Sequence, residues 1–196
     1  MRKYIVSVIS TVDGYFEGPG KDVMAMPFDD GFSRYNLELL QRADTVIHGS
    51  RWYDGGAYWS RVAEDESEPA IEREIGRING PLDRLVVSDS LRVDPAWPWA
   101  ARTRIVPVAD APAEVAALKQ REGRDIVSFG SATTWNPLLE AGLVDELHVL
   151  VGPALLGDGT KLFTGSPHPL RLLESRVLAD SQLVQLRYDA TGQHPA

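Results

Sequence analysis

Residues 130–163 read GSATTWNPLLEAGLVDELHVLVGPALLGDGTKLF, and this stretch contains the pattern that decides the fold. The small, polar turn at 130–132 opens a segment of helical character that runs to Ala141. Residues 144–151 are rich in β-branched and apolar side chains, which predicts a strand. The following residues, 152–160, carry three glycines and are expected to form a loop.

The same alternation of strand and helix patterns extends outward from this stretch. Runs of β-branched and apolar residues predict strands at 4–9, 45–48, 85–87, 104–108 and 125–129. Helical spacing of apolar residues predicts helices at about 30–43, 68–78 and 110–121, and residues 50–60 fit a loop or a short helix. Two further strand candidates, 171–178 and 182–189, predict a C-terminal hairpin.

Strands that alternate with helices imply crossover connections and a largely parallel sheet, and the hairpin adds an antiparallel edge. We therefore expect an α/β fold in which helices flank a mixed, mostly parallel sheet. The length of 196 residues fits a single domain over residues 1–190, followed by a short tail at 191–196. In such sheets, ligands bind beyond the carboxyl ends of the strands.

The composition argues against several classes of function. The chain has no cysteine, which excludes a disulfide framework and a cysteine nucleophile, and its four histidines lack metal-ligand spacing, so no metal site is expected. A net charge of −8 without a basic patch argues against nucleic-acid binding. The chain shows neither a signal-peptide pattern nor a run of about 18 apolar residues, so we expect a cytoplasmic protein without membrane contact.

Three predicted strands end in small, polar turns that could line a nucleotide. These turns are Gly49-Ser50-Arg51, Ser88-Asp89-Ser90 and Gly130-Ser131-Ala132-Thr133. Glycine lets the backbone approach a ligand closely, and the third turn opens a helix whose N-terminus favours a phosphate. The alternative is that glycine and serine are simply common after strands.

Two acidic residues are candidates for the chemistry. Asp13 follows the first strand and Glu146 lies on the strand at 144–151, where a carboxylate can move a proton or hold a sugar hydroxyl. The alternative is a solvated turn aspartate and an edge glutamate. Asp29 or Asp30 is expected to cap the helix at 30–43.

Other chemistry-bearing side chains favour structural roles. His48 ends a buried strand, and we expect a satisfied core residue rather than a catalytic one. Four aromatic residues could stack on a flat ring, but they could equally form core or a dimer contact: Trp52, Tyr53, Tyr58 and Trp59.

Taken together, several motifs resemble one family over nearly the whole chain. Leu138 to Glu146, followed by Pro153-x-Leu-Leu-Gly-x-Gly and Leu162-Phe163, looks like the C-terminal reductase domain of the bifunctional riboflavin-biosynthesis protein. That domain belongs to the dihydrofolate-reductase-like superfamily. Weaker matches are Ser10 to Gly14 with the family's S-x-D-G signature, residues 49–59 with its G-R-x-T-Y segment, and Ser88 to Leu91 with its S-R-T-L turn.

The resemblance implies a three-layer dihydrofolate-reductase-like fold, a homodimer and an NADPH-dependent reductase. The third turn, Gly130, Ser131, Ala132 and Thr133, then holds the pyrophosphate. The adenosine half lies on Gly49, Ser50, Arg51, Trp52, Ser88, Asp89 and Ser90. Val8, Ile9, Leu156 and Gly157 lie near the nicotinamide or substrate, and Asp13 and Glu146 face the substrate.

The chain departs from the family pattern at three of these positions. The family's first-turn arginine is Ser50 here, with Arg51 adjacent, its threonine is Trp52, and its second-turn arginine is Asp89. Arginine is the natural partner of the NADPH 2′-phosphate, whereas a carboxylate repels this group and accepts a hydrogen bond from a free 2′-hydroxyl. NADH or a deazaflavin therefore remain alternatives to NADPH.

The leading hypothesis is a reductase that transfers hydride from NADPH or NADH to a C=N or C=O bond of a small molecule. Such a protein is similar to 5-amino-6-(5-phosphoribosylamino)uracil reductase. One alternative is dihydrofolate reduction, with Asp29 at about the position of the acid that protonates the pterin region. The other is a non-catalytic nucleotide-binding dimer of the same fold.

Overall fold

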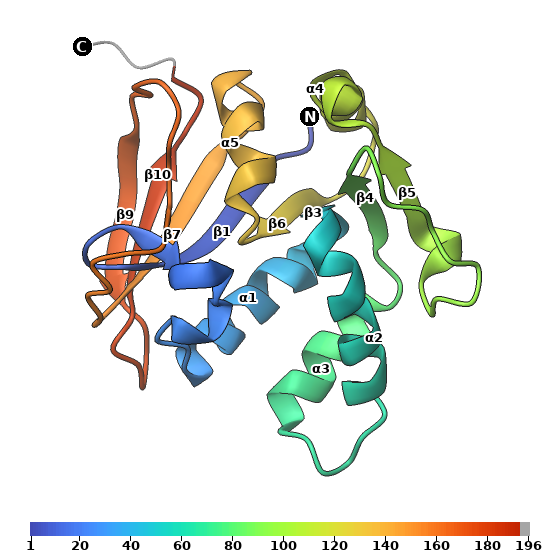
Figure 1. Cartoon of the computed structure of the whole chain (residues 1–196), viewed down its shortest axis with the longest axis horizontal. Helices are drawn as coiled ribbons and strands as arrows, with labels where there is room; N and C mark the ends of the chain where they lie inside the picture. Colours follow the sequence, from blue (N-terminus) through green and yellow to red (C-terminus); the bar gives the residue numbers. More distant parts are fainter. Residues whose placement is uncertain (193–196) are drawn as a thin grey trace.

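The computed structural model describes residues 1–192, apart from the side chains of residues 52–54. Its centre is an eight-stranded sheet in the order β5-β4-β3-β6-β1-β7-β10-β9 (Figure 1). The strands are β1 (Tyr4–Thr11), β3 (Ala43–Gly49), β4 (Asp83–Val87), β5 (Thr103–Val106), β6 (Asp125–Phe129), β7 (Glu146–Gly152), β9 (Arg171–Val177) and β10 (Val184–Asp189). Neighbours from β5 to β7 are parallel, and β10 is antiparallel to both β7 and β9. The predicted mixed sheet and its C-terminal hairpin are confirmed.

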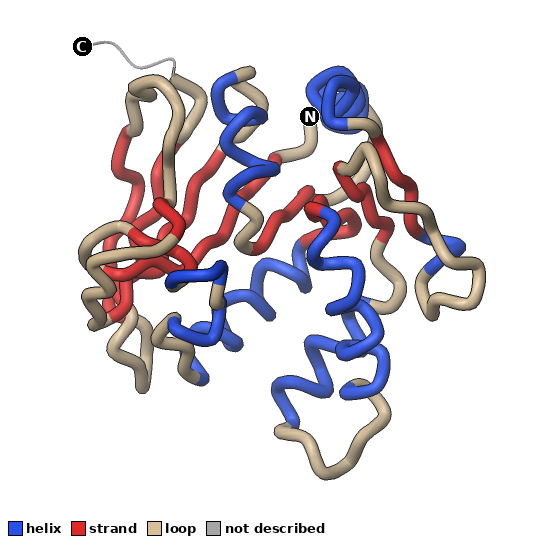
Figure 2. Tube along the Cα trace, viewed as in Figure 1, coloured by secondary structure: helices blue, strands red, loops and turns tan. Residues whose placement is uncertain are grey.

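Helices cover both faces of this sheet, as Figures 1 and 2 show. They are α1 (Asp30–Arg42), α2 (Tyr53–Val62), α3 (Ala70–Asn79), α4 (Ala111–Gln120) and α5 (Ala132–Glu140). Short 3-10 turns are η1 (Pro19–Lys21), η2 (Val23–Ala25), η3 (Ser50–Trp52), η4 (Ala100–Arg102) and η5 (Val108–Asp110). The segment at 50–60, compatible with a loop or a short helix, forms η3 and most of α2.

β1 divides the core into two clusters because successive side chains of a strand point to opposite faces. All eight of its residues are buried. Tyr4, Val6 and Val8 pack with residues of α4 and α5, whereas Ile5 and Ile9 pack with residues of α1 and α3. The result is three layers, helix–sheet–helix, with β1 at the centre.

A second, two-stranded sheet was not predicted from the sequence. β2 (Tyr15–Glu17) pairs antiparallel with β8 (Thr160–Lys161), which lies at the end of the glycine-rich loop. Gly159 has φ of +134°, and a Cβ there would stand 2.2 Å from the carbonyl oxygen of Glu17. Only glycine allows the loop to pack this closely on β2.

The start of α1 confirms the predicted cap. Asp29 Oδ1 accepts a hydrogen bond from the Phe32 amide at 3.1 Å, and its Oδ2 accepts one from Ser181 Oγ at 2.7 Å. Both carboxylate oxygens therefore serve the helix start and the β9–β10 turn. This arrangement gives Asp29 a structural role, and the residue is not available in the way that the dihydrofolate alternative requires.

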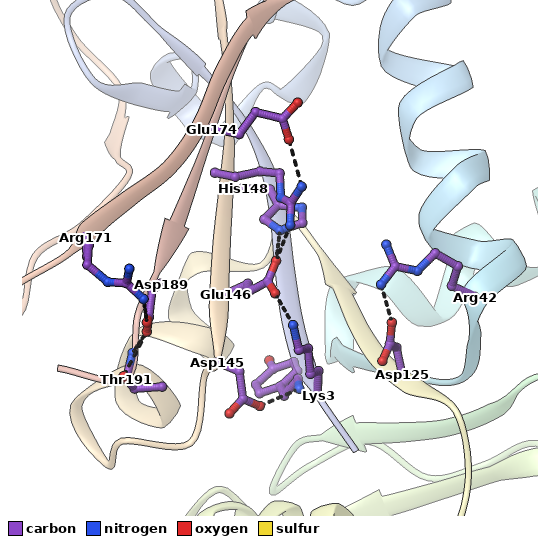
Figure 3. Close-up of polar contacts among 12 residues, drawn as sticks. Lys3, Arg42, Asp125, Asp145, Glu146, His148, Arg171, Glu174, Asp189 and Thr191 are labelled. Atoms are coloured by element: carbon purple, nitrogen blue, oxygen red, sulfur yellow. Dashed lines mark hydrogen bonds and ion pairs between the residues drawn. The ribbon is translucent and has the colours of Figure 1, made fainter. Parts of the chain in front are cut away.

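A buried polar network is centred on Glu146 at the start of β7 (Figure 3), and it extends to β10 and to α1. Lys3 Nζ donates a hydrogen bond to one carboxylate oxygen of Glu146 at 2.6 Å. The other oxygen lies 2.9 Å from His148 Nε2 and 3.1 Å from Arg187 Nη2. Tyr35 of α1 completes the chain, with its hydroxyl 2.8 Å from His148 Nδ1. A neutral His148 can donate from Nε2 to Glu146 and accept from Tyr35 at Nδ1, which satisfies both nitrogens of its ring.

The network fixes the protonation of its two central groups. The hydrogen bond from His148, helped by Lys3, holds the pKa of Glu146 well below its usual range although burial acts in the opposite direction. Burial lowers the pKa of His148. Glu146 is therefore a carboxylate whose oxygens are already occupied by three partners.

Replacing Glu146 by glutamine tests this network. Because the folded-state pKa is lowered, Glu146 stabilises the protein above pH 4.5, the unperturbed value, and this contribution is lost as the pH falls. At neutral pH, Glu146→Gln should cost about 1–3 kcal/mol in urea unfolding, since it leaves buried partners unsatisfied. Its stability should also fall less steeply than that of the wild type below pH 4.5. The exposed Glu64→Gln is the matched control, and an unchanged acid profile in Glu146→Gln contradicts the account.

Candidate functional site

The three predicted turns meet in one cavity at the carboxyl edge of the sheet. β3, β4 and β6 run parallel and end at Gly49, Val87 and Phe129. The turns that follow line a space of about 330 Å³, which we call the turn cavity. Its lining includes Gly49, Ser50, Ser88, Asp89, Ser90 and Thr133. Six side chains or backbone positions predicted to contact the cofactor are thus brought together.

The first turn touches the third, and only glycine permits this contact. A Cβ on Gly49 would stand 2.8 Å from Thr134 Oγ1. The third turn bends through the left-handed region at both Gly130, with φ of +62°, and Ser131, with φ of +54°. This bend aims the N-terminus of α5, the positive end of its dipole, at the edge of the sheet.

Asp89 of the second turn is held in place by the neighbouring η5. Its Oδ1 accepts a hydrogen bond from the Val108 amide at 3.0 Å. Ser88 Oγ accepts from the Ser90 and Leu91 amides at 3.3 and 3.0 Å, which fixes the turn. The turn cavity therefore carries a fixed carboxylate where the family resemblance implies an arginine.

A second cavity, about 410 Å³, lies on the α1 side of the same edge, and we call it the aromatic cavity. Its walls are mainly apolar and include Val8, Ile9, Phe16, Phe28, Phe32 and Phe129. Val8 and Ile9 line it, where the resemblance implies the nicotinamide or the substrate. Gly130 and Ser131 also line it, so the third turn separates it from the turn cavity.

A third cavity, about 680 Å³, lies beside α5 and includes Ala132 and Thr133 in its lining. The four residues predicted to bind the pyrophosphate, Gly130 to Thr133, are therefore divided among all three cavities. A ligand that extends from one of these cavities to another along the edge of the sheet would therefore contact the turn formed by residues 130–133.

Arg51 was predicted to lie against the adenosine half of the cofactor, but it is not among the residues that line the turn cavity. Its Nη2 lies 2.6 Å from Glu17 Oε1, and both residues line the aromatic cavity. Their ion pair connects the end of β3 to β2, residues that lie far apart in the sequence. The predicted contact of Trp52 with the cofactor concerns a side chain outside the described residues.

Asp13, which the resemblance placed facing the substrate, lies beside the glycine-rich loop. Thr11 Oγ1 donates to its Oδ1 at 2.6 Å, and the amides of Leu156 and Gly157 donate to its Oδ2 at 3.0 and 2.8 Å. The hydrogen bond from Thr11, followed by that from Gly157, lowers the pKa of Asp13. Asp13 is thus a carboxylate that holds the loop, and it carries no proton to donate at neutral pH. Asp13, Leu156 and Gly157 are not among the residues that line the three cavities.

Glu146 does not meet Asp13. β7 begins at Glu146 and runs parallel to β1, so Glu146 lies level with Ile5 while Gly152 lies level with Thr11. The structure therefore places Glu146 toward the opposite end of the strand, inside the ion-pair network described above. It is neither the substrate-facing residue nor the edge residue that the sequence suggested.

His48, Tyr58 and Trp59 are not among the residues that line these cavities. Burial lowers the pKa of His48 to about 3, so its ring is neutral at physiological pH. Tyr58 and Trp59 form an edge-to-face pair with ring centroids 5.1 Å apart, and neither lines the three cavities. In the part of the chain that the structure describes, no helix is long and apolar enough to cross a membrane.

The sequence analysis missed four polar residues of the aromatic cavity: Glu17, Lys21, Asn36 and Asn79. Asn36 was detectable, since it is a polar side chain on the apolar face of the helix at 30–43. It accepts a hydrogen bond from Ser7 Oγ at 2.8 Å. Glu17 gave no such signal, because its position depends on the pairing of β2 with a segment more than a hundred residues away.

Comparison with solved structures identifies the fold. A putative riboflavin biosynthesis protein from Shewanella sp. PV-4 aligns with a TM-score of 0.65 and 21% identity, covering 95% of this chain and 98% of that one. A pyrimidine reductase-like protein from Corynebacterium diphtheriae aligns with a TM-score of 0.67 and 18% identity, covering 96% and 91%. Both share the predicted dihydrofolate-reductase-like fold.

A deaminase and 5-amino-6-(5-phosphoribosylamino)uracil reductase from Thermotoga maritima aligns with a TM-score of 0.66 and 11% identity. The alignment covers 96% of this chain but 56% of that longer protein. Among curated proteins, the uncharacterized protein YyaP of Bacillus subtilis is 26% identical over 195 residues, which is 97% of this chain and 96% of that one.

The model of the RibD C-terminal domain matches residues 2–186. This range includes β1 to β9, the first residues of β10, the five α-helices named above and the three turns at the carboxyl edge. The chain therefore belongs to the RibD C-terminal domain family, as the motifs of residues 130–163 indicated.

Proposed function

We propose that this protein is an NADPH- or NADH-dependent reductase that transfers hydride to a C=N or C=O bond of a small molecule. The observation that carries the proposal is the meeting of three strand-end turns in one cavity beside the N-terminus of α5. Membership of a family of reductase domains supports it. A related substrate is proposed rather than the uracil derivative named for the Thermotoga protein, because that protein is only 11% identical to this chain.

The three cavities lie along the carboxyl edge of the sheet, and their residues would hold the successive parts of a dinucleotide. Gly130 to Thr133 would hold the pyrophosphate through backbone amides and the helix dipole. Ser50 and the second turn would hold the adenosine half, and Val8 and Ile9 would face the nicotinamide. When bound, the nicotinamide supplies the hydride, while the protein supplies orientation and electrostatics.

Asp13 contributes to this proposal as a positioning residue. Its carboxylate fixes the amides of Leu156 and Gly157, and thereby the loop that continues into β8. Because its pKa is lowered, it can accept hydrogen bonds but does not act as the proton donor. Glu146 has no part in the chemistry, since its oxygens are occupied by Lys3, His148 and Arg187.

Calorimetric titration with NADPH and with NADH at one fixed salt concentration tests the cofactor proposal. We expect micromolar binding of at least one of them, and turnover of that nucleotide with a panel of carbonyl and imine compounds. Asp89→Arg should shift the ratio of the two affinities toward NADPH by about tenfold, since it replaces a repulsive charge by a partner of the 2′-phosphate.

Glu64→Arg makes the same change of charge at an exposed position and should leave that ratio unchanged. If the wild type binds neither nucleotide, the proposal is wrong. Binding without turnover on any compound of the panel supports a non-catalytic nucleotide-binding protein instead. An unchanged ratio in Asp89→Arg means that Asp89 does not face the ribose.

The positioning role of Asp13 is testable by amide hydrogen exchange. In Asp13→Ala, the amides of Leu156 and Gly157 should exchange about tenfold faster, because each loses a charge-assisted hydrogen bond. Asp158→Ala is the matched control in the same loop. Asp158 Oδ1 accepts a hydrogen bond from the Gly159 amide, whereas the Leu156 and Gly157 amides donate to Asp13. If the amides of Leu156 and Gly157 exchange at the same rate in Asp13→Ala and in the wild type, the Asp13 carboxylate does not hold the loop.

The family resemblance implied a homodimer, and we also propose that its two copies associate through the outer strand β9. Leu172, Leu173 and Val177 of this strand are 54%, 41% and 64% exposed. An outer strand with exposed apolar side chains is prone to association unless a partner covers it. The wild type should therefore be a dimer by light scattering and Val177→Lys a monomer with unchanged unfolding. A monomeric wild type contradicts this proposal.

A further inference from the structure

Glu17 is a buried carboxylate that the reductase chemistry described so far does not use. It is the last residue of β2 and its side chain is 7% exposed. Pairing of Glu17 with Thr160 and the close packing of Gly159 on its carbonyl oxygen hold its backbone. The side chain lines the aromatic cavity, on the same side of the sheet edge as Val8 and Ile9.

The two oxygens of this carboxylate differ. Oε1 receives Arg51 Nη2 at 2.6 Å. Oε2 is buried and accepts no hydrogen bond from any residue that the structure describes. A buried acceptor without a donor costs about 1–3 kcal/mol, so its retention at a cavity points to a ligand that supplies the donor.

The walls of the cavity indicate the shape of that ligand. Phe28 and Phe32 form an edge-to-face pair with ring centroids 4.8 Å apart, and Ile9 and Phe129 add further apolar surface. Such walls favour the faces of a flat ring. A polar group at the edge of the ring is then needed to meet Glu17.

The chemistry of a carboxylate decides which polar group fits. A carboxylate that is paired with arginine has only acceptor sites left, so it binds an N–H group and repels a carbonyl oxygen or an anion. Asn36 and Asn79, which also line the cavity, can serve groups of either kind, whereas Lys21, a further lining residue, can only donate. Among the described residues that line this cavity, Glu17 is the one carboxylate, and it therefore selects for ligands with an N–H donor.

We propose that Glu17 is the specificity-determining residue of the substrate cavity and selects flat heteroaromatic substrates that carry an N–H donor on the ring edge. Arg51 is its positioning residue, since it holds Oε1 and leaves Oε2 for the ligand. This inference rests on the proposed function, which makes the aromatic cavity the substrate half of the site.

The test uses two probes of nearly identical shape, 2-aminoquinoline and 2-methylquinoline. The first carries an amino donor where the second carries a methyl group. The wild type should bind 2-aminoquinoline at least about tenfold more tightly in calorimetry, the expected size for a hydrogen bond to a charged group. Glu17→Gln places an amide donor at this position and should abolish that preference while 2-methylquinoline binds as before.

Two further variants keep the result interpretable. Glu17→Asp retains the charge but withdraws it by one methylene, and it should also lose most of the preference. Glu64→Gln, at an exposed position, should keep it. A wild type that binds both probes equally, or neither, overturns the inference, and so does a Glu17→Gln variant that keeps the preference.

NADPH and NADH titrated into the same samples separate this inference from the proposed function. Nucleotide binding without probe preference overturns the role of Glu17 alone. Probe preference without binding of either nucleotide overturns the reductase proposal and leaves the selection of N–H donors by Glu17 standing.

Discussion

The arrangement of the whole molecule depends on the burial of β1 on both of its faces. Its alternate side chains complete two separate cores, and its backbone pairs in parallel with β6 and β7. A strand of this kind must lie in the middle of the sheet, with helix layers on both sides. Its carboxyl end then delivers Thr11 and Asp13 to the edge where the neighbouring strands also end. The site is thus a consequence of strand direction, before any catalytic side chain is considered.

The sequence alone predicts the elements and the edge at which the turns meet, because both follow from local patterns. Glycine and serine after buried strands identify the turns at Gly49, Ser88 and Gly130 without knowledge of their partners. Arg51 and Glu146 were misplaced because their positions depend on non-local facts. The Arg51 side chain follows its ion pair with Glu17, and Glu146, the first residue of β7, is held by Lys3 and Arg187 from distant parts of the sequence. The small β2–β8 sheet was missed for the same reason, since two and three residues give too short a period to detect.

Charged groups are used differently at the two edges of the sheet. Toward the amino edge, Glu146 is saturated by Lys3, His148 and Arg187, and it contributes to stability. At the carboxyl edge, the carboxylates of Asp89 and Glu17 each have one oxygen held by the protein and lie against a cavity. Groups that are fixed in position but only partly satisfied are suited to recognition, because their orientation costs nothing when a ligand binds. This division agrees with the placement of ligand sites at the carboxyl ends of parallel strands.

The central claim is that the carboxyl edge, and not another cavity, holds the nicotinamide dinucleotide. The competing place is a cavity of about 540 Å³ at the amino edge, whose lining includes Arg2, Arg84, Arg104 and Arg121 and would also attract phosphates. Backbone amide shifts of ¹⁵N-labelled protein, followed while NADPH is added, distinguish the two most directly. The account predicts that the amides of Gly49, Ser88 and Thr133 shift together in one saturable transition while that of Arg104 stays unchanged. Shifts confined to the arginine-lined cavity would contradict it.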